Sequence, residues 1–247
     1  MNSKPRISII TVVYNGKEAI QQTIKSIAAQ TYTNIEYIVV DGASTDGTVD
    51  IIKNSSSINQ WVSEKDKGLY DAMNKGIDMA TGDYLWFINA GDSIFDNTIL
   101  DKVFSLPLAD VYYGQTMIVD AQGKELGLRR LKAPENFTWK SLLNGMLVCH
   151  QSFIVRKEIT TKYSTHFHIS ADYEWMIKCM KKAKTVCNSH LTLSRFLDGG
   201  LNKTRMGTGL KERYSIMMDH YGFFPTLFVH LYFPIRFAIF YLIHKRV

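Results

Sequence analysis

The sequence contains little cysteine and lacks the glycine-rich motifs of several nucleotide-binding folds. Its three cysteines among 247 residues form no CxxC pair and no metal-ligand spacing, so we expect neither a disulfide framework nor a cysteine-based metal site. Reduced thiols are typical of a cytoplasmic protein. Neither GxGxxG nor GxxxxGKS/T occurs, and the first apolar run ends in Tyr14-Asn15-Gly16. This argues against a nucleotidyltransferase with a basic phosphate loop after its first strand.

An N-terminal targeting signal and low-complexity segments are also absent. Residues 1–6 are polar, and the apolar run at residues 7–14 is too short for a signal peptide and carries no cleavage-like site, so we do not expect secretion. Hydrophobic residues make up 46% and charged residues 21%, which is typical of an ordered globular chain. The length suits one large α/β domain or two closely packed halves.

The formal net charge of +6 and the pI near 9.1 favour an anionic partner. A nucleic acid, a diphosphate and an acidic membrane surface would each fit, and a role in solubility alone is an equal alternative. The positive charges form no stripe and match no nucleic-acid-binding motif, so no nucleic-acid partner is expected.

Strand and helix patterns alternate over the first hundred residues. Continuous apolar runs rich in β-branched residues predict buried strands, and helical spacing predicts helices between them. This alternation predicts an α/β fold with a parallel sheet and right-handed crossovers. The expected strands are residues 7–13, 35–40, 61–63 and 84–89, and the expected helices are residues 17–30, 48–53 and 68–80.

Asn15, Asp41 and Asp92 each follow one of these strands, so they should gather at the edge where parallel sheets bind ligands. Carboxylates clustered at such an edge repel each other unless a cation offsets their charge. A divalent ion that holds a diphosphate would do so, since hard cations bind phosphates together with one or two carboxylates. Asp92 is the best-placed ligand, with capping of a helix near Asn97 as its alternative. For Asp41 the alternative is an Asx turn.

The second half of the chain is less regular. A strand is expected within residues 110–119, around Val111-Tyr112-Tyr113-Gly114, and a short one at residues 153–155, with a hairpin turn at Gln122-Gly123. A helix is expected over residues 170–182, capped by Ser170.

Five segments of the chain, in order, resemble glycosyltransferase family 2, whose members are inverting enzymes with the GT-A fold. The resemblance is specific over residues 6–105, weaker over residues 106–215 and absent beyond. It implies a Rossmann-like, mostly parallel sheet flanked by helices, as in small bacterial enzymes that build polysaccharides such as O-antigen. Residues 1–105 would form the nucleotide-sugar-binding half, residues 106–215 the acceptor-binding half and residues 216–247 a helical tail. The matching segments are residues 7–15, 26–31, 37–48, 63–76 and 80–92.

The resemblance also implies roles for single residues. Asn89-Ala90-Gly91-Asp92 matches the metal-binding block Asp-x-Asp, although its first acid is missing at position 90. Asp92 would therefore bind the Mn²⁺ or Mg²⁺ that bridges the diphosphate. The residues expected to bind the donor, a UDP-sugar, are Thr11, Val13, Tyr14, Asn15, Asp41, Lys67, Asp71, Asn74, Asn89, Ala90 and Gly91.

The family places its catalytic base at the start of a helix in the second half, commonly in a Glu-Asp pair. Here the pair reads Ala171-Asp172, so Asp172 is the favoured base and Glu174 the rival. Asp172 would remove the proton of the acceptor hydroxyl as that oxygen displaces the nucleoside diphosphate, with inversion at the anomeric carbon. His150 and Gln151 would contact the acceptor sugar, although a structural histidine is the alternative.

A glycine-rich segment with three basic residues follows at residues 195–205. Arg195, Lys203 and Arg205 would sit on a lid over the phosphates, with a plain flexible loop as an equal alternative.

The tail differs from the rest of the chain. Residues 222–247 are strongly apolar and contain no acid, but Pro225, Pro234 and Arg236 make a membrane-spanning helix unfavourable. An interfacial anchor is favoured, with Lys245 and Arg246 on anionic headgroups. Burial within the protein or a homo-oligomer is the alternative. The interfacial interpretation predicts a polyprenyl-diphosphate-linked sugar as acceptor and a peripheral location on the cytoplasmic face of the inner membrane.

Two further interpretations of the function remain open. One is a nucleotide-sugar-using transferase with a soluble acceptor, and the other is a degenerate, non-catalytic scaffold. The presence of both Asp92 and Asp172 argues against the scaffold.

Overall fold

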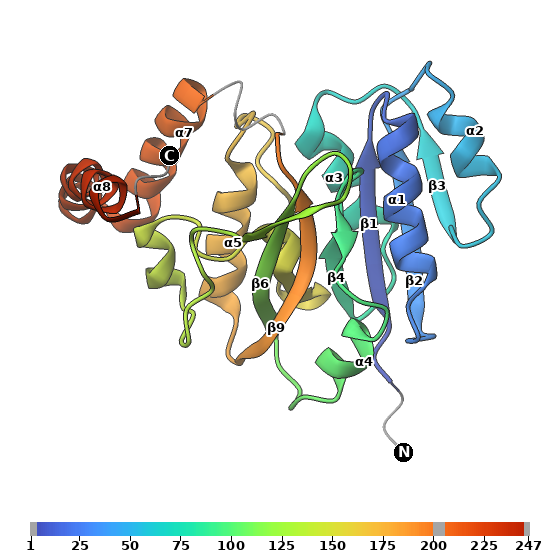
Figure 1. The fold of residues 1–247 in the computed structure, drawn as a ribbon, viewed down its shortest axis with the longest axis horizontal. Coiled ribbons are helices and arrows are strands. Elements are labelled where there is room, and N and C mark those ends of the chain that lie inside the picture. The colour runs from blue at the N-terminus through green and yellow to red at the C-terminus, as the bar shows by residue number, and fades with distance from the viewer. Residues whose placement is uncertain (1–3, 200–205, 245–247) are drawn as a thin grey trace.

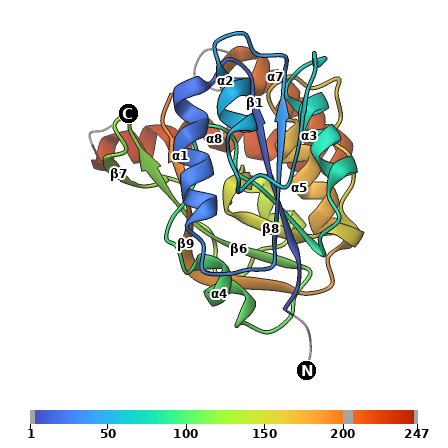
Figure 2. The ribbon, with the colours of Figure 1, turned by 90° about the vertical axis from the view of Figure 1, so that its right-hand side faces the viewer.

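The computed structural model describes residues 4–199 and 206–244 of the chain. Within these residues one twisted sheet of nine strands runs in the order β3-β2-β1-β4-β8-β6-β9-β5, and β7 pairs with β6 (Figure 1). Helices cover both faces of the sheet: Figure 2 shows α1 on one side of β1 and α3 and α5 on the other.

The N-terminal half has the predicted alternation. Its strands β1 to β4 pair in parallel, in the order β3-β2-β1-β4. The predicted strand at residues 84–89 ends two residues early, at Phe87. The elements are β1 (Ile7–Val13), α1 (Lys17–Ala28), β2 (Ile35–Asp41), α2 (Thr48–Lys53), β3 (Gln60–Ser63), α3 (Leu69–Met79) and β4 (Tyr84–Phe87).

Two hydrophobic cores lie on opposite faces of the sheet because successive side chains of a strand point to opposite faces. Ile7 and Ile9 of β1 belong to the core beneath α1, α2 and α4, whereas Ile10 and Val12 belong to the core beneath α3 and α5. Every residue of β1 is buried, which explains its continuous apolar sequence.

The C-terminal half adds a mixed sheet. Strand β8 lies antiparallel to both β4 and β6, and β9 lies parallel to β6. Strand β9 has twelve residues and was not predicted from the sequence. The elements are β5 (Ser93–Ile94), α4 (Ile99–Phe104), β6 (Val111–Val119), β7 (Glu125–Leu128), η1 (Trp139–Asn144), η2 (His150–Ser152), β8 (Phe153–Arg156), η3 (Lys157–Ile159), α5 (Ala171–Lys182) and β9 (Val186–Leu197).

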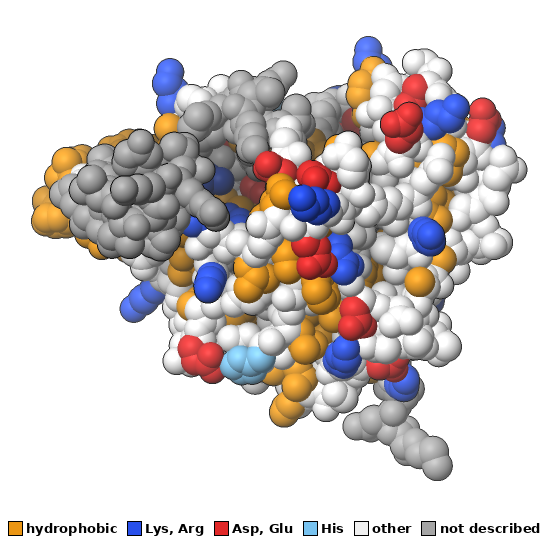
Figure 3. Space-filling view, in the orientation of Figure 1, with side chains coloured by type: hydrophobic (Ala, Val, Ile, Leu, Met, Phe, Trp, Pro, Cys, Tyr) orange, Lys and Arg blue, Asp and Glu red, His pale blue; other side chains and the backbone are white. Residues whose placement is uncertain are grey.

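The chain ends in two helices, α7 (Met206–Tyr221) and α8 (Phe223–His244), at the left of Figure 1. Helix α8 continues through both prolines of the tail. Hydrophobic side chains gather at this outer edge of the molecule (Figure 3). None of the described helices combines the length and apolar character that crossing a bilayer requires.

Candidate functional site

A cleft of about 360 Å³ opens at the carboxyl end of β1, between the turn after β4 and the start of α5. Asp92 and Asp172 both line it, so the structure joins the two halves of the chain around one space. Its lining residues are Val12, Val13, Tyr14, Gly16, Ala19, Leu69, Tyr70, Met73, Asn89, Ala90, Asp92, His150, Gln151, His168, Ile169, Asp172, Phe196 and Leu197.

Asp92 is buried in the turn that follows β4. Its Oδ2 accepts a hydrogen bond from Gln151 Nε2 at 2.8 Å, and its Oδ1 accepts one from the backbone N–H of Leu197 at 3.1 Å. Burial raises the pKa of Asp92 to about 6, and these two bonds only partly oppose the increase. Gly91 precedes it with a φ of 96°, a conformation that favours glycine.

The alternative role of Asp92 as a helix cap is wrong. The helix near Asn97 begins at Ile99, and it is Asp96 that accepts the backbone N–H of Thr98 at 2.7 Å.

Asp172 lies in the first turn of α5. Its Oδ1 accepts the backbone N–H of Tyr173 at 2.8 Å, and its Oδ2 lies 3.5 Å from His150 Nδ1. Burial favours the neutral acid, but hydrogen bonding and charge from His150, the charge of Arg213 and the Tyr173 N–H together lower the pKa of Asp172. Asp172 is therefore held as a carboxylate that can accept a proton.

Glu174 does not line the cleft. It forms an ion pair with Lys178 at 2.9 Å and accepts a hydrogen bond from Ser164. Burial alone would raise its pKa, but bonds from His220, Ser164 and Lys178 lower the pKa of Glu174 to about 2. The geometry thus favours Asp172 over its rival.

Ser170 occupies the N-cap position of α5, but its side chain makes no capping bond. Its hydroxyl donates instead to the backbone carbonyl of Gly209 at 3.2 Å. The prediction that the Ser170 side chain caps α5 is therefore wrong.

His150 and Gln151 connect the two carboxylates through the short helix η2. The ring of His150 lies between Asp172 and Asn89, whose Nδ2 is 3.4 Å from Nε2 of the imidazole. The Oε1 of Gln151 accepts the thiol of Cys149 at 2.7 Å, which turns its NH₂ group toward Asp92. Both residues line the cleft, and their contact with an acceptor stays a prediction.

A second cleft, of about 680 Å³, adjoins the first. Val12, Val13, Tyr14 and Leu69 line both, so the two form one connected region along the sheet edge. The residues that line only the second cleft are Gly42, Ala43, Lys65, Asp66, Gly68 and Ala72.

The loops after β1 and β2 are tied together beside this second cleft. Asn15 Oδ1 accepts the N–H of Thr45 at 2.9 Å, and Ser44 bonds to both the Asn15 N–H and Asp41 Oδ2. Asn15 and Ala43 both have positive φ angles, 47° and 63°. Such backbone strain is common at ligand-binding loops.

Asp41 is fully buried. Its Oδ2 accepts from Ser44 N–H at 2.9 Å and from Ser63 Oγ at 2.6 Å, so the alternative role in a turn is present. Its Oδ1 is buried without a hydrogen-bond partner. A buried carboxylate oxygen without a hydrogen-bond partner destabilises the folded protein. Because a ligand donor would relieve this cost, Asp41 Oδ1 is a candidate acceptor for a donor group of a ligand.

Several residues expected to face the donor lie outside both clefts. Thr11 is buried and donates to the carbonyl of Ile88, because its side chain points into the core beneath α1. Asn74 bonds to both the N–H and the carbonyl of Tyr163. Asp71 accepts the backbone N–H of Lys67 at the start of α3. These three side chains line neither cleft, and their contact with the donor stays a prediction.

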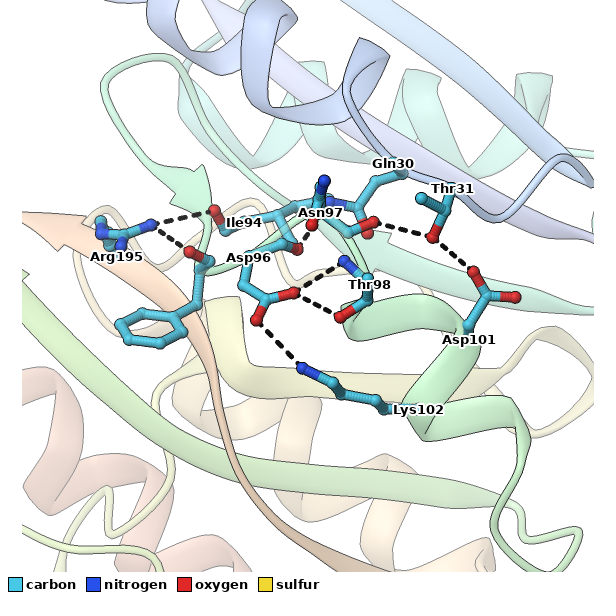
Figure 4. Close-up of polar contacts among 10 residues, drawn as sticks. Gln30, Thr31, Ile94, Asp96, Asn97, Thr98, Asp101, Lys102 and Arg195 are labelled. Atoms are coloured by element: carbon cyan, nitrogen blue, oxygen red, sulfur yellow. Dashed lines mark hydrogen bonds and ion pairs between the residues drawn. The ribbon is translucent and has the colours of Figure 1, made fainter.

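Arg195 does not belong to the cleft. Its guanidinium pairs with Glu125 at 3.0 Å, lies 4.3 Å from the ring centre of Phe95 and donates to the backbone carbonyls of Ile94 and Phe95 (Figure 4). Arg195 lies within strand β9 and lines neither cleft, so it does not belong to a flexible lid. Lys203 and Arg205 lie outside the described residues.

Residues that sequence reasoning missed include Tyr70, His168 and Leu197. Tyr70 donates to the carbonyl of Ile169 at 2.7 Å and lies 3.4 Å from Asp172 Oδ1. Leu197 donates its backbone N–H to Asp92, a contact that no side-chain pattern in the sequence predicts.

The donor set at the turn after β4 fits a hard divalent ion. No three His, Cys, Asp or Glu side chains come together as a metal site in the described part of the chain, so Asp92 would have to share the ion with substrate oxygens. Asn89, at the other end of this turn, has a buried Oδ1 without a partner. The oxygen atoms of Asp92 and Asn89 are of the kind that suits Mn²⁺ or Mg²⁺.

Comparison of the sequence with known proteins identifies the family to which the chain belongs. The profile of the family described as Glycosyl transferase family 2 matches residues 8–163, more than half of the chain. An uncharacterized glycosyltransferase of Mycobacterium tuberculosis is 33% identical over 190 residues, which cover 72% of this chain and 70% of the relative. A PGL/p-HBAD biosynthesis glycosyltransferase of Mycobacterium bovis is 29% identical over 213 residues, covering 81% and 80%.

Solved structures share the fold. Staphylococcus aureus TarS 1-349 in complex with UDP-GlcNAc matches with a TM-score of 0.65 and 18% identity, over 86% of this chain. The chain spans 64% of that fragment. The mannosyltransferase PcManGT of Pyrobaculum calidifontis, in complex with GDP-Man and Mn²⁺, matches with a TM-score of 0.66 and 18% identity, covering 94% and 70%.

Proposed function

Because the chain belongs to glycosyltransferase family 2, we propose that it transfers a hexosyl unit from a UDP-sugar to a sugar acceptor, with inversion at the anomeric carbon. In this proposal residues 1–105 bind the donor and residues 106–215 bind the acceptor. The observation that supports it most is the single cleft shared by Asp92 and Asp172.

The two carboxylates have environments suited to different tasks. Asp92 accepts hydrogen bonds only from uncharged donors, Gln151 and the Leu197 N–H, and its pKa stays raised, so a cation bound beside it would stabilise the carboxylate. Asp172 faces His150 and the charge of Arg213, which keep it ionised. Pairs of acids whose environments separate their pKa values commonly divide catalytic roles in this way.

In the reaction, Asp172 accepts the proton of the acceptor hydroxyl while that oxygen forms the new glycosidic bond. The bond between the anomeric carbon and the diphosphate breaks, and its electron pair leaves with the nucleoside diphosphate. His150, beside Asp172, stabilises the carboxylate before transfer. A divalent ion at Asp92 would supply positive charge to the leaving diphosphate. Tyr14, exposed by 69% and shared by both clefts, would cover the nucleoside.

The decisive experiment substitutes the two acids separately. Asp172→Asn should abolish transfer to an acceptor while UDP-sugar binding survives, because the amide cannot take a proton. Asp92→Asn should weaken Mn²⁺-dependent binding of UDP. Transfer at the wild-type rate by Asp172→Asn would refute the assignment of the base, and absence of Mn²⁺-dependent transfer by the wild-type protein would favour a non-catalytic scaffold.

For the acceptor we favour a polyprenyl-diphosphate-linked sugar over a soluble sugar. The support is the exposed apolar surface of α7 and α8, seen at the edge of the molecule in Figure 3. We define it as the tail surface; its most exposed members are Leu210, Phe223, Phe224, Phe228, Leu231 and Tyr232, each at least 50% exposed. Such a surface fits the interfacial region of a bilayer, and we place the protein peripherally on the cytoplasmic face of the inner membrane.

A further inference from the structure

A single carboxylate of α7 binds the backbone that leads into the catalytic helix. Glu212 Oε1 accepts the N–H of His168 at 2.8 Å, and its Oε2 accepts the N–H groups of Ile169 and Ser170, each at 2.9 Å. Three consecutive backbone donors thus share one side chain more than forty residues further along the chain. Charge-assisted bonds of this kind are stronger than neutral ones.

The segment that Glu212 binds is part of the cleft. His168 and Ile169 line it, and Asp172 follows two residues after Ser170. Tyr70 holds the same segment from the other side through the carbonyl of Ile169. The carboxylate of Glu212 also lies at the N-terminus of α5, where negative charge is favourable.

A second contact of α7 reaches the same segment. The carbonyl of Gly209 accepts the hydroxyl of Ser170 at 3.2 Å. A Cβ added at Gly209 would lie only 3.2 Å from Ile169 Cγ2, so the helix backbone packs directly against the segment. Glu212 and Gly209 lie three residues apart, hence on one face of α7.

We propose that Glu212 is a positioning residue for the base Asp172, and that α7 thereby makes the tail part of the catalytic machinery. This inference rests on the proposed function, in which Asp172 removes the proton of the acceptor. Loss of the carboxylate leaves three N–H groups without their acceptor and frees the start of α5 to shift. The reaction is sensitive to such shifts because the base must lie within hydrogen-bond reach of the hydroxyl.

The positioning role of Glu212 can be distinguished from a merely structural role in docking α7, because a second carboxylate also links α5 to α7. Glu174 Oε1 lies 3.8 Å from Nε2 of His220 on α7 and 2.9 Å from Lys178. The Glu174 backbone N–H donates to the carbonyl of Ser170, but its carboxylate does not bind the N–H groups of residues 168–170, which bond to Glu212. Glu174→Gln is therefore a matched control for weakened docking of α7 without loss of the loop contacts.

The test measures kcat, KM for the acceptor and Kd for UDP in Glu212→Gln, Glu212→Ala and Glu174→Gln. We expect kcat to fall about 30-fold in both Glu212 variants, because a fall of this size corresponds to the loss of about one charge-assisted hydrogen bond in the transition state. The Kd for UDP should be unchanged. Glu174→Gln should keep kcat within about threefold. Hydrogen exchange at residues 168–170 should rise in the Glu212 variants alone.

An unchanged kcat in Glu212→Gln, or an equal fall in Glu174→Gln, would overturn the proposal. If Glu212→Ala does not fold, Gly209→Ala replaces it, since the added methyl group pushes on Ile169 from the same helix. The Asp172→Asn variant separates this inference from the proposed function. Full transfer by Asp172→Asn would refute the assignment of the base, whereas inactive Asp172→Asn beside a fully active Glu212→Gln would refute only the positioning role.

Discussion

At the scale of single residues, the cleft contains two buried acids whose pKa values move in opposite directions. Burial raises the pKa of Asp92 by removing the carboxylate from water, and the bonds from Gln151 and the Leu197 N–H, together with the charge of His150, only partly oppose the increase. Burial acts on Asp172 as well, but there His150 and Arg213 contribute positive charge and the pKa falls. The difference therefore arises from the partners and not from the depth of burial.

Metal binding should depend on pH through Asp92. Its pKa of about 6 in the folded state lies above the ordinary value of 3.8, so the stability that Asp92 contributes is full below about pH 4 and is lost as the pH rises to 6. The loss is about 3 kcal/mol at most. A divalent ion binds the ionised carboxylate of Asp92 and offsets this loss of stability. We expect Mn²⁺ to raise the melting temperature more at pH 7.5 than at pH 5 in a thermal shift assay.

The control for this prediction is Asp92→Asn, which cannot ionise. In that variant the Mn²⁺-induced shift should be small and independent of pH. A pH-independent shift in the wild-type protein would contradict a role for Asp92 as the ligand.

The pH profile of transfer should report the contact between His150 and Asp172. Without the imidazole the pKa of Asp172 rises, because both a hydrogen bond and a positive charge that lower it are lost. His150→Gln should therefore move the acid limb of the kcat profile to higher pH. His168→Gln is the control, since His168 lines the same cleft without pairing with Asp172. Equal profiles of His150→Gln and the wild-type protein would contradict the contact.

At the scale of elements, the site depends on how closely helices approach the sheet. Helix α3, which begins between the two clefts, crosses β1 at Gly76. A Cβ added there would lie 2.4 Å from Ile10 Cγ2 in the buried core. The small residue at position 76 therefore sets the distance between α3 and the strand that ends at the site.

Gly76→Ala should lower the free energy of unfolding by about 1–3 kcal/mol, because the added methyl group overpacks the core. Gly207→Ala on α7 is the matched control, since nothing lies within 4 Å of its added Cβ and alanine favours a helix. Urea unfolding followed by circular dichroism measures both. A stable Gly76→Ala protein would show that α3 can move away from β1 without cost.

At the scale of the whole molecule, the tail helices lie beside α5, at the end of the molecule away from α1 and α2 (Figure 1), and α7 packs against the segment that lines the cleft. The tail surface contains the most exposed phenylalanines of the described chain, Phe224 at 69% and Phe228 at 68%. Glu212 and Gly209 connect the same helical unit to the segment before Asp172.

Binding to membranes should depend on the tail surface. Replacement of both Phe224 and Phe228 by serine should reduce co-sedimentation with anionic phospholipid vesicles at least tenfold, because the burial of two aromatic side chains is lost. Truncation after Tyr221 should abolish it. Serine at Leu126 and Leu128, exposed by 55% and 42% on β7, is the control. Unchanged sedimentation of the double variant, with a change in oligomeric state, would instead indicate a homo-oligomer contact.

The local pattern of apolar residues was sufficient to predict the strands and helices of the N-terminal half. The period of apolar residues distinguishes strands from helices, and the resulting alternation predicted the parallel strands β1 to β4 and the polar groups at their ends. It failed for β9, where buried and exposed residues follow no regular period and His190 has a φ of 55° that bends the strand. The mixed pairing of β6, β8 and β9 depends on contacts that no local window contains.

The sequence by itself determined which residue types stand at the ends of strands, because propensity and periodicity act over a few neighbours. Only the tertiary structure decided that Asp92 shares a cleft with Asp172, that Gln151 turns its amide toward Asp92, and that Thr11 and Asn74 face inward. Each of these outcomes follows from packing between segments about sixty to one hundred residues apart. Hydrogen bonds over such separations depend on orientation in space, which the order of residues along the chain does not specify.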